Sequence, residues 1–215
     1  MAIETTTIDT GNNAAALTTW LQANATEYLT DIVNTEGTIT ANVIGGGSFT
    51  FIPGTRYCGK FTADSGYEKS LDFGTSTGAL FTISVAYKTS KGIVLSTTKN
   101  PTRVPFTIII GKTNNNTVYG INLIPNTSSS SSLEVNNLAP PQVVDFNESN
   151  IEYRNINAGK PNYSVLTSIA AMPINDTYNY GDGLYYVAST DIGRFGIIEY
   201  NTKHYVACGS VWLEE

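Results

Sequence analysis

Apolar side chains recur at steps of three and four residues near the start of the chain. Such spacing places side chains on one stripe of a helix, and it predicts a helix over residues 10–33. Asn12 or Asn13 can cap its start, and a turn at residues 34–37 ends it. The stripe packs either on a sheet of the same chain or on a neighbouring copy. It contains Leu17, Trp20, Leu21, Ala25, Tyr28, Leu29, Ile32 and Val33, and we expect Leu17, Trp20, Leu21 and Tyr28 to form an interface.

After residue 36 the pattern changes to an alternation of apolar and polar residues, which is typical of β-strands. Short strands follow one another at regular spacing, and the joints between them are rich in Gly, Pro, Asn and Ser. This series predicts a mostly β protein, an antiparallel sandwich or a set of meander sheets with one N-terminal α-helix. The predicted strands cover residues 37–44, 48–52, 57–61, 79–88, 92–97, 104–110, 117–124, 163–172, 184–188, 195–200, 204–208 and 211–213.

Residues 127–150 have the composition of a linker or a long exposed loop. They contain five consecutive serines, Ser128–Ser132, and the pair Pro140-Pro141. The sequence therefore predicts four segments: an N-terminal helical segment at 1–36, a β domain at 37–126, the linker or loop at 127–150, and a C-terminal β region at 151–215.

Charge is scarce, and polarity comes from 29 Thr and 21 Asn rather than from ionised groups, which make up only 14% of residues. The net charge is −6 and the 12 Lys and Arg residues are scattered, whereas nucleic-acid binding needs clustered cations. We therefore expect no nucleic-acid partner. No apolar run approaches the length of a membrane span, and the first residues do not form a signal peptide, so we expect neither a membrane span nor secretion.

Catalytic residue patterns are missing from the sequence. The only histidine, His204, alternates with Tyr205 on a predicted strand, and we interpret it as a surface or interface residue. No nucleophile elbow is present, and one His with two distant cysteines cannot form a zinc cluster. Paired acids of the glycosidase kind remain open, because sequence spacing says little about distance in space. We predict no enzymatic activity, no cofactor and no metal, and we expect Cys58 and Cys208 to be free thiols.

Two loops resemble ligand-binding motifs only in part. Residues 175–183 hold oxygen ligands around glycines, but they lack the distal Glu of a calcium loop. Residues 45–47 are three glycines followed by a strand instead of the Lys and helix of a phosphate loop. We interpret the first as a turn-rich loop and the second as a sharp turn.

Tyrosines gather ahead of the last predicted hairpin. A tyrosine has an apolar ring and a polar hydroxyl, so it serves sheet packing, subunit interfaces and sugar stacking alike. All three interpretations stay open for the possible glycan or subunit contacts Tyr178, Tyr180, Tyr185 and Tyr186.

Three stretches of the chain carry a resemblance to a known class of proteins. They are residues 17–21 (LTTWL), residues 86–92 (AYKTSKG), and residues 183–186 (GLYY) together with 209–213 (GSVWL). With these stretches the chain resembles small structural proteins encoded among the virion genes of tailed bacteriophages and prophages of gut-type bacteria.

The resemblance implies a repeated, non-enzymatic virion component of the tail, baseplate, head-fibre or decoration type. The expected partners are other copies of the chain and neighbouring virion proteins, with assembly in the host cytoplasm. The resemblance assigns no functional residues. The alternative is a glycan- or receptor-binding module of a fibre or tail tip. A tailspike hydrolase is a third class, but the repeats and multiple inward acids of such enzymes are missing.

Overall fold

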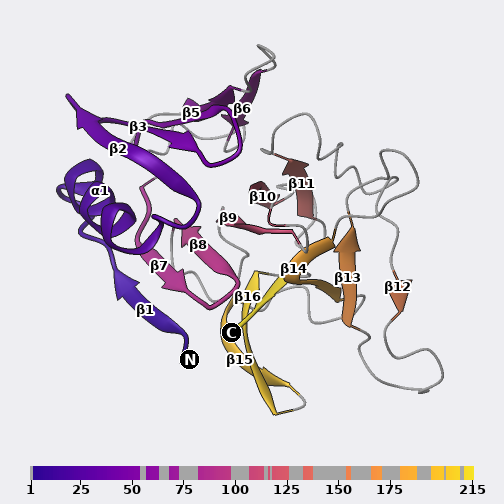
Figure 1. Cartoon of the computed structure of the whole chain (residues 1–215). Coiled ribbons are helices and arrows are strands. Elements are labelled where there is room, and N and C mark those ends of the chain that lie inside the picture. Colours follow the sequence, from indigo (N-terminus) through magenta and orange to yellow (C-terminus); the bar gives the residue numbers. More distant parts are fainter. Residues whose placement is uncertain are drawn as a thin grey trace.

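The protein is mostly β, with antiparallel sheets and one helix near the N-terminus in the part of the chain that the structure describes. The structure is a computed structural model (Figure 1), and this fold confirms the predicted class. It describes residues 2–53, 57–62, 68–72, 82–97, 107–113, 116, 118–125, 133–137, 154–155, 166–170, 180–187, 195–200, 202–208 and 211–215.

Three sheets make up the described fold. The central sheet has the order β1 (Glu4–Thr7), β7 (Val85–Lys88), β8 (Gly92–Ser96), β9 (Thr107–Lys112), β10 (Val118–Pro125) and β11 (Leu133–Asn137). The N-terminal sheet is a meander of β2 (Leu29–Thr35), β3 (Thr38–Val43), β4 (Ser48–Phe51), β5 (Tyr57–Thr62) and β6 (Glu68–Asp72). The C-terminal sheet has the order β12 (Arg154–Asn155), β13 (Leu166–Ala170), β14 (Tyr180–Val187), β17 (Val211–Glu214), β16 (Lys203–Cys208) and β15 (Phe195–Tyr200).

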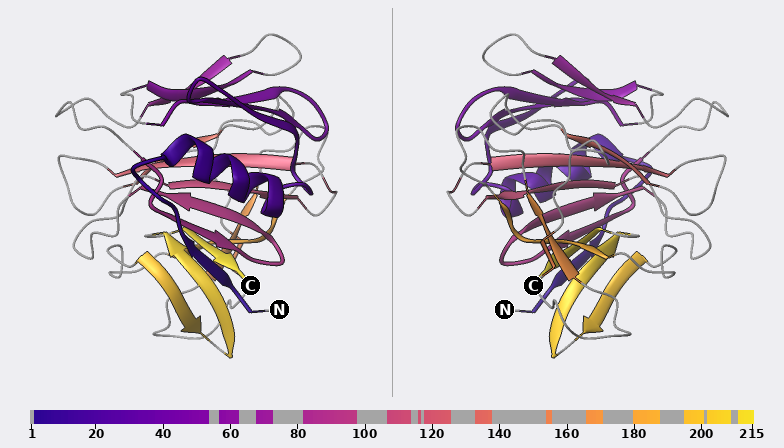
Figure 2. Two further views of the ribbon diagram at one scale, coloured as in Figure 1. Left: turned by 90° about the vertical axis from the view of Figure 1, so that its left-hand side faces the viewer. Right: turned by 90° about the vertical axis from the view of Figure 1, so that its right-hand side faces the viewer.

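The central sheet is buried on both faces, and this property decides how the layers stack. In β9 every residue from Thr107 to Gly111 is buried, because alternate side chains enter different cores. Ile108 and Ile110 face the helix-side core, whereas Ile109 faces the second core beneath the C-terminal sheet. The views in Figure 2 show the N-terminal sheet at the top, the central sheet with the helix at the same height in the middle, and the yellow strands of the C-terminal sheet at the bottom.

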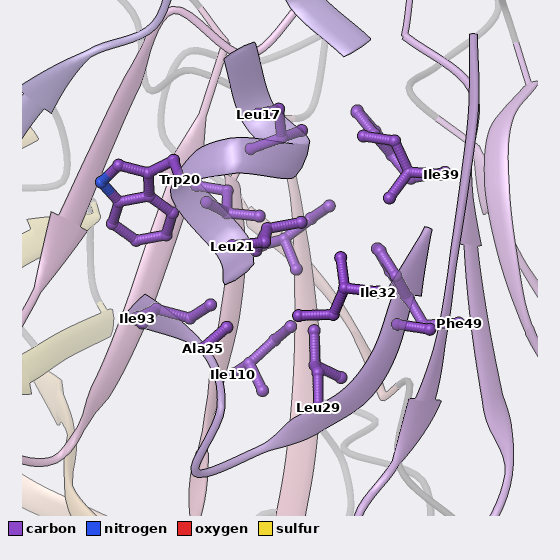
Figure 3. Close-up of a cluster of buried hydrophobic side chains, with 14 of the residues drawn as sticks. Leu17, Trp20, Leu21, Ala25, Leu29, Ile32, Ile39, Phe49, Ile93 and Ile110 are labelled. Atoms are coloured by element: carbon purple, nitrogen blue, oxygen red, sulfur yellow. The ribbon is translucent and has the colours of Figure 1, made fainter. Parts of the chain in front are cut away.

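The helix-side core is filled from three directions. Helix α1 (Asn13–Asn24) and one face of the N-terminal sheet both point apolar side chains at the central sheet (Figure 3). Leu17 and Leu21 of the helix are completely buried, as is Ile93 of the central sheet. A buried aliphatic side chain stabilises a fold by about 1.5–3 kcal/mol. Burial of many such side chains therefore holds the helix and the N-terminal sheet against the central sheet.

The predicted helix over residues 10–33 is wrong in its second half. Helix α1 ends at Asn24, and strand β2 begins at Leu29. Asn12 occupies the N-cap position but makes no side-chain capping hydrogen bond. With 12 residues, α1 is too short to cross a bilayer, and the structure holds no other helix within the described ranges that could do so.

The four side chains expected to form an interface lie in the core of their own chain. Leu17, Trp20, Leu21 and Tyr28 are each 8% exposed or less, so contact with another copy through them is blocked in this conformation. The helix packs on the sheets of its own chain, which is the alternative given in the sequence analysis. This packing already removes the large aromatic rings from water, so no partner chain is needed to cover them.

Several local expectations can be compared directly with the structure. The three glycines after β3 all have positive φ, at 97°, 127° and 91°, so they form the sharp turn predicted for them. Tyr200 pairs with Lys203, which leaves a two-residue hairpin loop with Thr202 at φ 66°. Strand β11 falls inside the range 127–150 predicted as a linker or loop, and most of that range lies outside the described residues. The four-segment division of the chain stays a prediction.

Candidate functional site

The C-terminal sheet has one face in the second core and a different, aromatic face on the outside. Alternation along β16 and β17 sends Val206, Cys208, Val211 and Leu213 inward. The intervening positions form what we call the outer aromatic cluster. It consists of buried Tyr205, Ala207 and Trp212 with partly buried Tyr185, Ile198 and Tyr200 packed against them.

Strand register explains why these side chains meet. Tyr185 of β14 pairs with Trp212 of β17, which in turn pairs with Ala207 of β16. Two residues away on the same face of β16, Tyr205 pairs with Glu214 of β17 on one side and with Ile198 of β15 on the other. Side chains on adjacent paired positions are within contact distance, so two cross-strand rows build the cluster.

The rings of the cluster meet edge to face. The centroids of Tyr185 and Tyr205 are 6.0 Å apart at 79°, and those of Tyr200 and Trp212 are 6.1 Å apart at 72°. Tyr205 and Trp212 are 5.7 Å apart and tilted by 47°. These separations fall in the range where aromatic pairs attract beyond their simple burial, and they fix the ring positions.

A carboxylate lies at the edge of this cluster. Glu214 accepts a hydrogen bond from the Tyr185 hydroxyl at 2.8 Å through Oε2, and one from Lys203 Nζ at 2.7 Å through Oε1. The Glu214 side chain is 15% exposed and that of Lys203 is 56% exposed. The site therefore offers an anchored carboxylate, an ammonium group and half-buried tyrosine rings at one place.

Burial and the carboxylate both keep the tyrosines neutral. Burial raises the pKa of Tyr205 to about 12, and the charges of Glu214 and Tyr200 add to this effect. The pKa of Tyr185 is also raised, first by burial and then by its hydrogen bond to Glu214. A neutral phenol keeps its O–H, so Tyr185 can donate its hydrogen bond to Glu214 at neutral pH.

His204 lies away from this cluster. It occupies the alternate face of β16, is 51% exposed, and places Nδ1 2.9 Å from Glu215 Oε2. Surface placement agrees with its interpretation from the sequence. Among the described residues, no group of three His, Cys, Asp or Glu side chains gathers closely enough to hold a metal ion.

A second notable polar group is the hydroxyl of Tyr119, which is buried without a hydrogen-bond partner. Glycines make room for it: a Cβ at Gly111 would lie 2.5 Å from the hydroxyl oxygen, and one at Gly181 would lie 3.3 Å from the ring. Burial, followed by the nearby Tyr28 and Asp182, raises the Tyr119 pKa. Asp182 is itself paired with Lys91 at 2.8 Å, and we interpret this group as packing.

The tyrosines selected from the sequence are described to different extents. Tyr185 belongs to the outer aromatic cluster, whereas Tyr180 and Tyr186 are described only as strand residues of β14, and Tyr178 lies outside the described residues. Sequence reasoning missed Tyr200, Tyr205, Trp212 and Glu214. The short connection between the predicted strands 195–200 and 204–208 could have revealed Tyr200 and Tyr205, because a hairpin there fixes which residues of the two strands share a face.

The cysteine prediction is confirmed for one residue. Cys208 is a free, completely buried thiol, and burial raises its pKa. The side chain of Cys58, on β5, lies outside the described part of the structure.

Comparisons of the chain with protein-family models, with curated proteins and with solved structures found no match in any of the three.

Proposed function

We propose that this protein is a non-enzymatic structural component of a bacteriophage virion, present in multiple copies on the tail or capsid. Its position on a particle is inferred from the sequence resemblance given above. The observation that supports assembly is the chemistry of the sheet edges. Monomeric β proteins often guard exposed edges with Lys. Edge strands β6 and β12 contain Lys69 and Arg154, whereas edge strands β1, β2 and β15 contain no Lys or Arg. Each of these three strands carries one acid and no cation. An edge without Lys, above all β15 with its exposed Ile197, favours assembly with other subunits.

The test is the composition of purified particles. Particles produced by the genome that encodes this chain are purified on a density gradient, and their proteins are quantified by mass spectrometry. We expect the chain at a fixed ratio of several copies per particle, together with immunogold labelling of one part of the virion. Recovery of the chain only in the unassembled fraction, with none in particles, would contradict the proposal.

The outer aromatic cluster favours a second function, the binding of a host-surface glycan. Sugar rings stack on aromatic faces, and their hydroxyls bond to carboxylates. Tyr185 and Tyr200 are half-buried rings, and Glu214 is held beside them by Tyr185 and Lys203. Aromatic rings beside a carboxylate match the chemistry by which proteins bind neutral polysaccharides.

Binding to purified host capsule or cell-wall polysaccharide tests this second function. Saturation-transfer NMR should show contact with the sugar, and Glu214→Gln and Tyr200→Ala should each weaken it. Glu199→Gln is the matched control, because Glu199 is an exposed acid on the opposite face of the same hairpin. Equal binding by all three variants, or none by the unchanged protein, would exclude the cluster as a glycan site.

A further inference from the structure

The edge strands of the three sheets differ in how well they resist pairing with another chain. Any edge strand carries unpaired backbone N–H and C=O groups that can accept an additional strand. Side chains are described for three such edges: β1 of the central sheet, β2 of the N-terminal sheet and β15 of the C-terminal sheet. We therefore compare these three.

Two of the three edges carry features that discourage pairing. Strand β1 has only four residues, Glu4 and three threonines, and all of them are exposed, so it offers no apolar surface. Strand β2 is interrupted by a register shift between Thr30 and Val33, where Asp31 has φ 51°. A bulge twists an edge and breaks the regular spacing that another strand would need.

Strand β15 has neither protection. All six of its residues pair in register with β16, from Phe195↔Cys208 to Tyr200↔Lys203. Its first residue is anchored to the central sheet by an edge-to-face contact between Phe195 and Tyr87, with centroids 5.9 Å apart. Two residues further on, Ile197 is 47% exposed. A large apolar side chain thus lies on a continuously paired, firmly held edge, next to Gly196 with its positive φ of 122°. This edge is at the end of the molecule where the β15–β16 hairpin projects (Figure 1).

Hairpin geometry gives the direction of the free backbone groups. In a two-residue hairpin the closing pair, here Tyr200 and Lys203, exchanges both backbone hydrogen bonds. Backbone direction alternates along a strand, so Ile197 and Glu199 point their N–H and C=O groups away from β16. The exposed isoleucine therefore lies at a position ready for an additional strand.

We propose that β15 pairs antiparallel with β15 of a second copy, about a two-fold axis that passes through Ile197. This joins two C-terminal sheets into one continuous sheet. On one face Ile197 lies opposite Ile197 of the partner subunit, which buries both exposed side chains. On the other face Ile198 of the partner subunit lies opposite Gly196, where a Cβ would meet no atom within 4 Å, so there is room for it.

Charge also fits a second copy as the occupant. With the axis at Ile197, Glu199 lies opposite Phe195 of the partner subunit, and the two Glu199 carboxylates are not paired with each other. Like charges directly opposite on paired strands destabilise a sheet, and this register avoids that arrangement. The inference deepens the proposed function only in naming the surface between copies. It is tested on purified protein, so its outcome is independent of what particles contain.

The first experiment measures the mass of the purified full chain by light scattering and sedimentation. We expect a concentration-dependent dimer, and we expect Ile197→Lys to lower the dimer fraction at least tenfold with an unchanged circular dichroism spectrum. Val33→Lys is the matched control, because Val33 is 50% exposed on the bulged edge β2, and it should dimerise normally. A monomeric unchanged protein, or a dimer that survives Ile197→Lys, overturns the proposal.

The second experiment tests the register without relying on a disruptive change. In a Cys58→Ser background, Ile197→Cys places one thiol of each copy at the two-fold axis, so mild oxidation should yield a covalent dimer. Glu199→Cys places the thiol opposite Phe195 of the partner subunit and should cross-link much less. Equal cross-linking of the two variants, or none with Ile197→Cys, contradicts the proposed axis.

Discussion

Asn13 connects the helix to the central sheet through its side-chain amide. Its Nδ2 donates to the carbonyl oxygens of Ile83, at 2.5 Å, and Asp9, at 3.3 Å, while its Oδ1 accepts from the backbone N–H of Ile83 at 3.2 Å. Both Ile83 contacts are buried and span seventy positions of sequence. The sequence suggested Asn13 as a helix cap, whereas the structure gives it this longer-range role.

Replacing Asn13 should therefore cost more than the loss of a cap. Asn13→Ala leaves the buried N–H and C=O of Ile83 without partners, and we expect the free energy of unfolding in urea to fall by about 1–3 kcal/mol. Asn13→Asp should be at least as harmful, because a carboxylate cannot donate to the Ile83 carbonyl. Asn12→Ala is the control and should change stability by less than about 0.5 kcal/mol, since Asn12 is exposed. Equal effects at both positions would contradict this role.

Gly92 is a position where any side chain would collide with backbone. A Cβ there would lie 2.5 Å from the carbonyl oxygen of Ile110 and 3.2 Å from Leu213 Cδ2. We expect Gly92→Ala to destabilise the protein by about 1–3 kcal/mol in urea denaturation, because the adjacent strand β9 and the C-terminal sheet must both shift. Gly11→Ala is the control, since its Cβ would meet only Asp9 Oδ1, at 3.4 Å. Similar midpoints for the two variants would count against the collision.

At the scale of elements, the helix-to-strand error in residues 25–33 has a specific cause. Leu29 and Ile32 are three residues apart and both are buried, which is the spacing of a helix face. In a regular strand such residues would face opposite sides. The bulge at Asp31 inserts an extra residue, so Leu29 and Ile32 face the same core in strand β2. A bulged strand can therefore show the same spacing of three residues between buried apolar positions as a helix.

The bulge gives a test of its own. Asp31 has φ 51°, a conformation that Asn and Gly tolerate and β-branched residues avoid. We expect Asp31→Val to lower the free energy of unfolding by about 1–3 kcal/mol, whereas Asp31→Asn should change it little and Asp31→Gly should keep the backbone unstrained. Thermal unfolding of the three variants checks the order. A valine variant as stable as the asparagine variant would mean that the bulge is not strained.

Regular strands were predicted better than this bulged one, and the reason is again local. Strands β3, β4, β8, β15, β16 and β17 match their predicted ranges to within two residues, because alternation and turn residues are both readable in sequence. The pairings β1 with β7 and β14 with β17 join distant segments, and no local signal specifies them. The outer aromatic cluster depends on the second of these pairings, so only one of its tyrosines, Tyr185, was selected beforehand.

For the whole molecule, neutral buried tyrosines link stability to pH. Burial, aided by nearby carboxylates, raises the pKa of Tyr28 and Tyr205 to about 12, whereas an unfolded tyrosine ionises near pH 10. A raised pKa in the folded state gives stability that is present below pH 10 and is lost as pH rises toward 12. Each residue contributes a slope of at most about 1.4 kcal/mol per pH unit.

Absorbance at 295 nm and circular dichroism, recorded together between pH 9 and 13, test this link. We expect part of the tyrosine ionisation to occur only as the fold is lost, so the two transitions should coincide in their upper part. Tyr205→Phe should shift the alkaline unfolding to higher pH if its ring packing is kept. Complete ionisation of all tyrosines near pH 10 in a folded protein would contradict the burial of these rings.

The central sheet, which is covered on both faces, also gives a reference rate for amide hydrogen exchange in this molecule. Strands β8 and β9 lie between other strands within the sheet and have a core on each face, so their amide hydrogens reach solvent only when the whole fold opens. Deuterium uptake there should be the slowest in the chain and should give the free energy of global unfolding without denaturant. Amides of β15 should exchange much sooner in dilute protein and should slow as the concentration rises. Time courses at several protein concentrations would therefore record both the opening of the fold and the association of two copies.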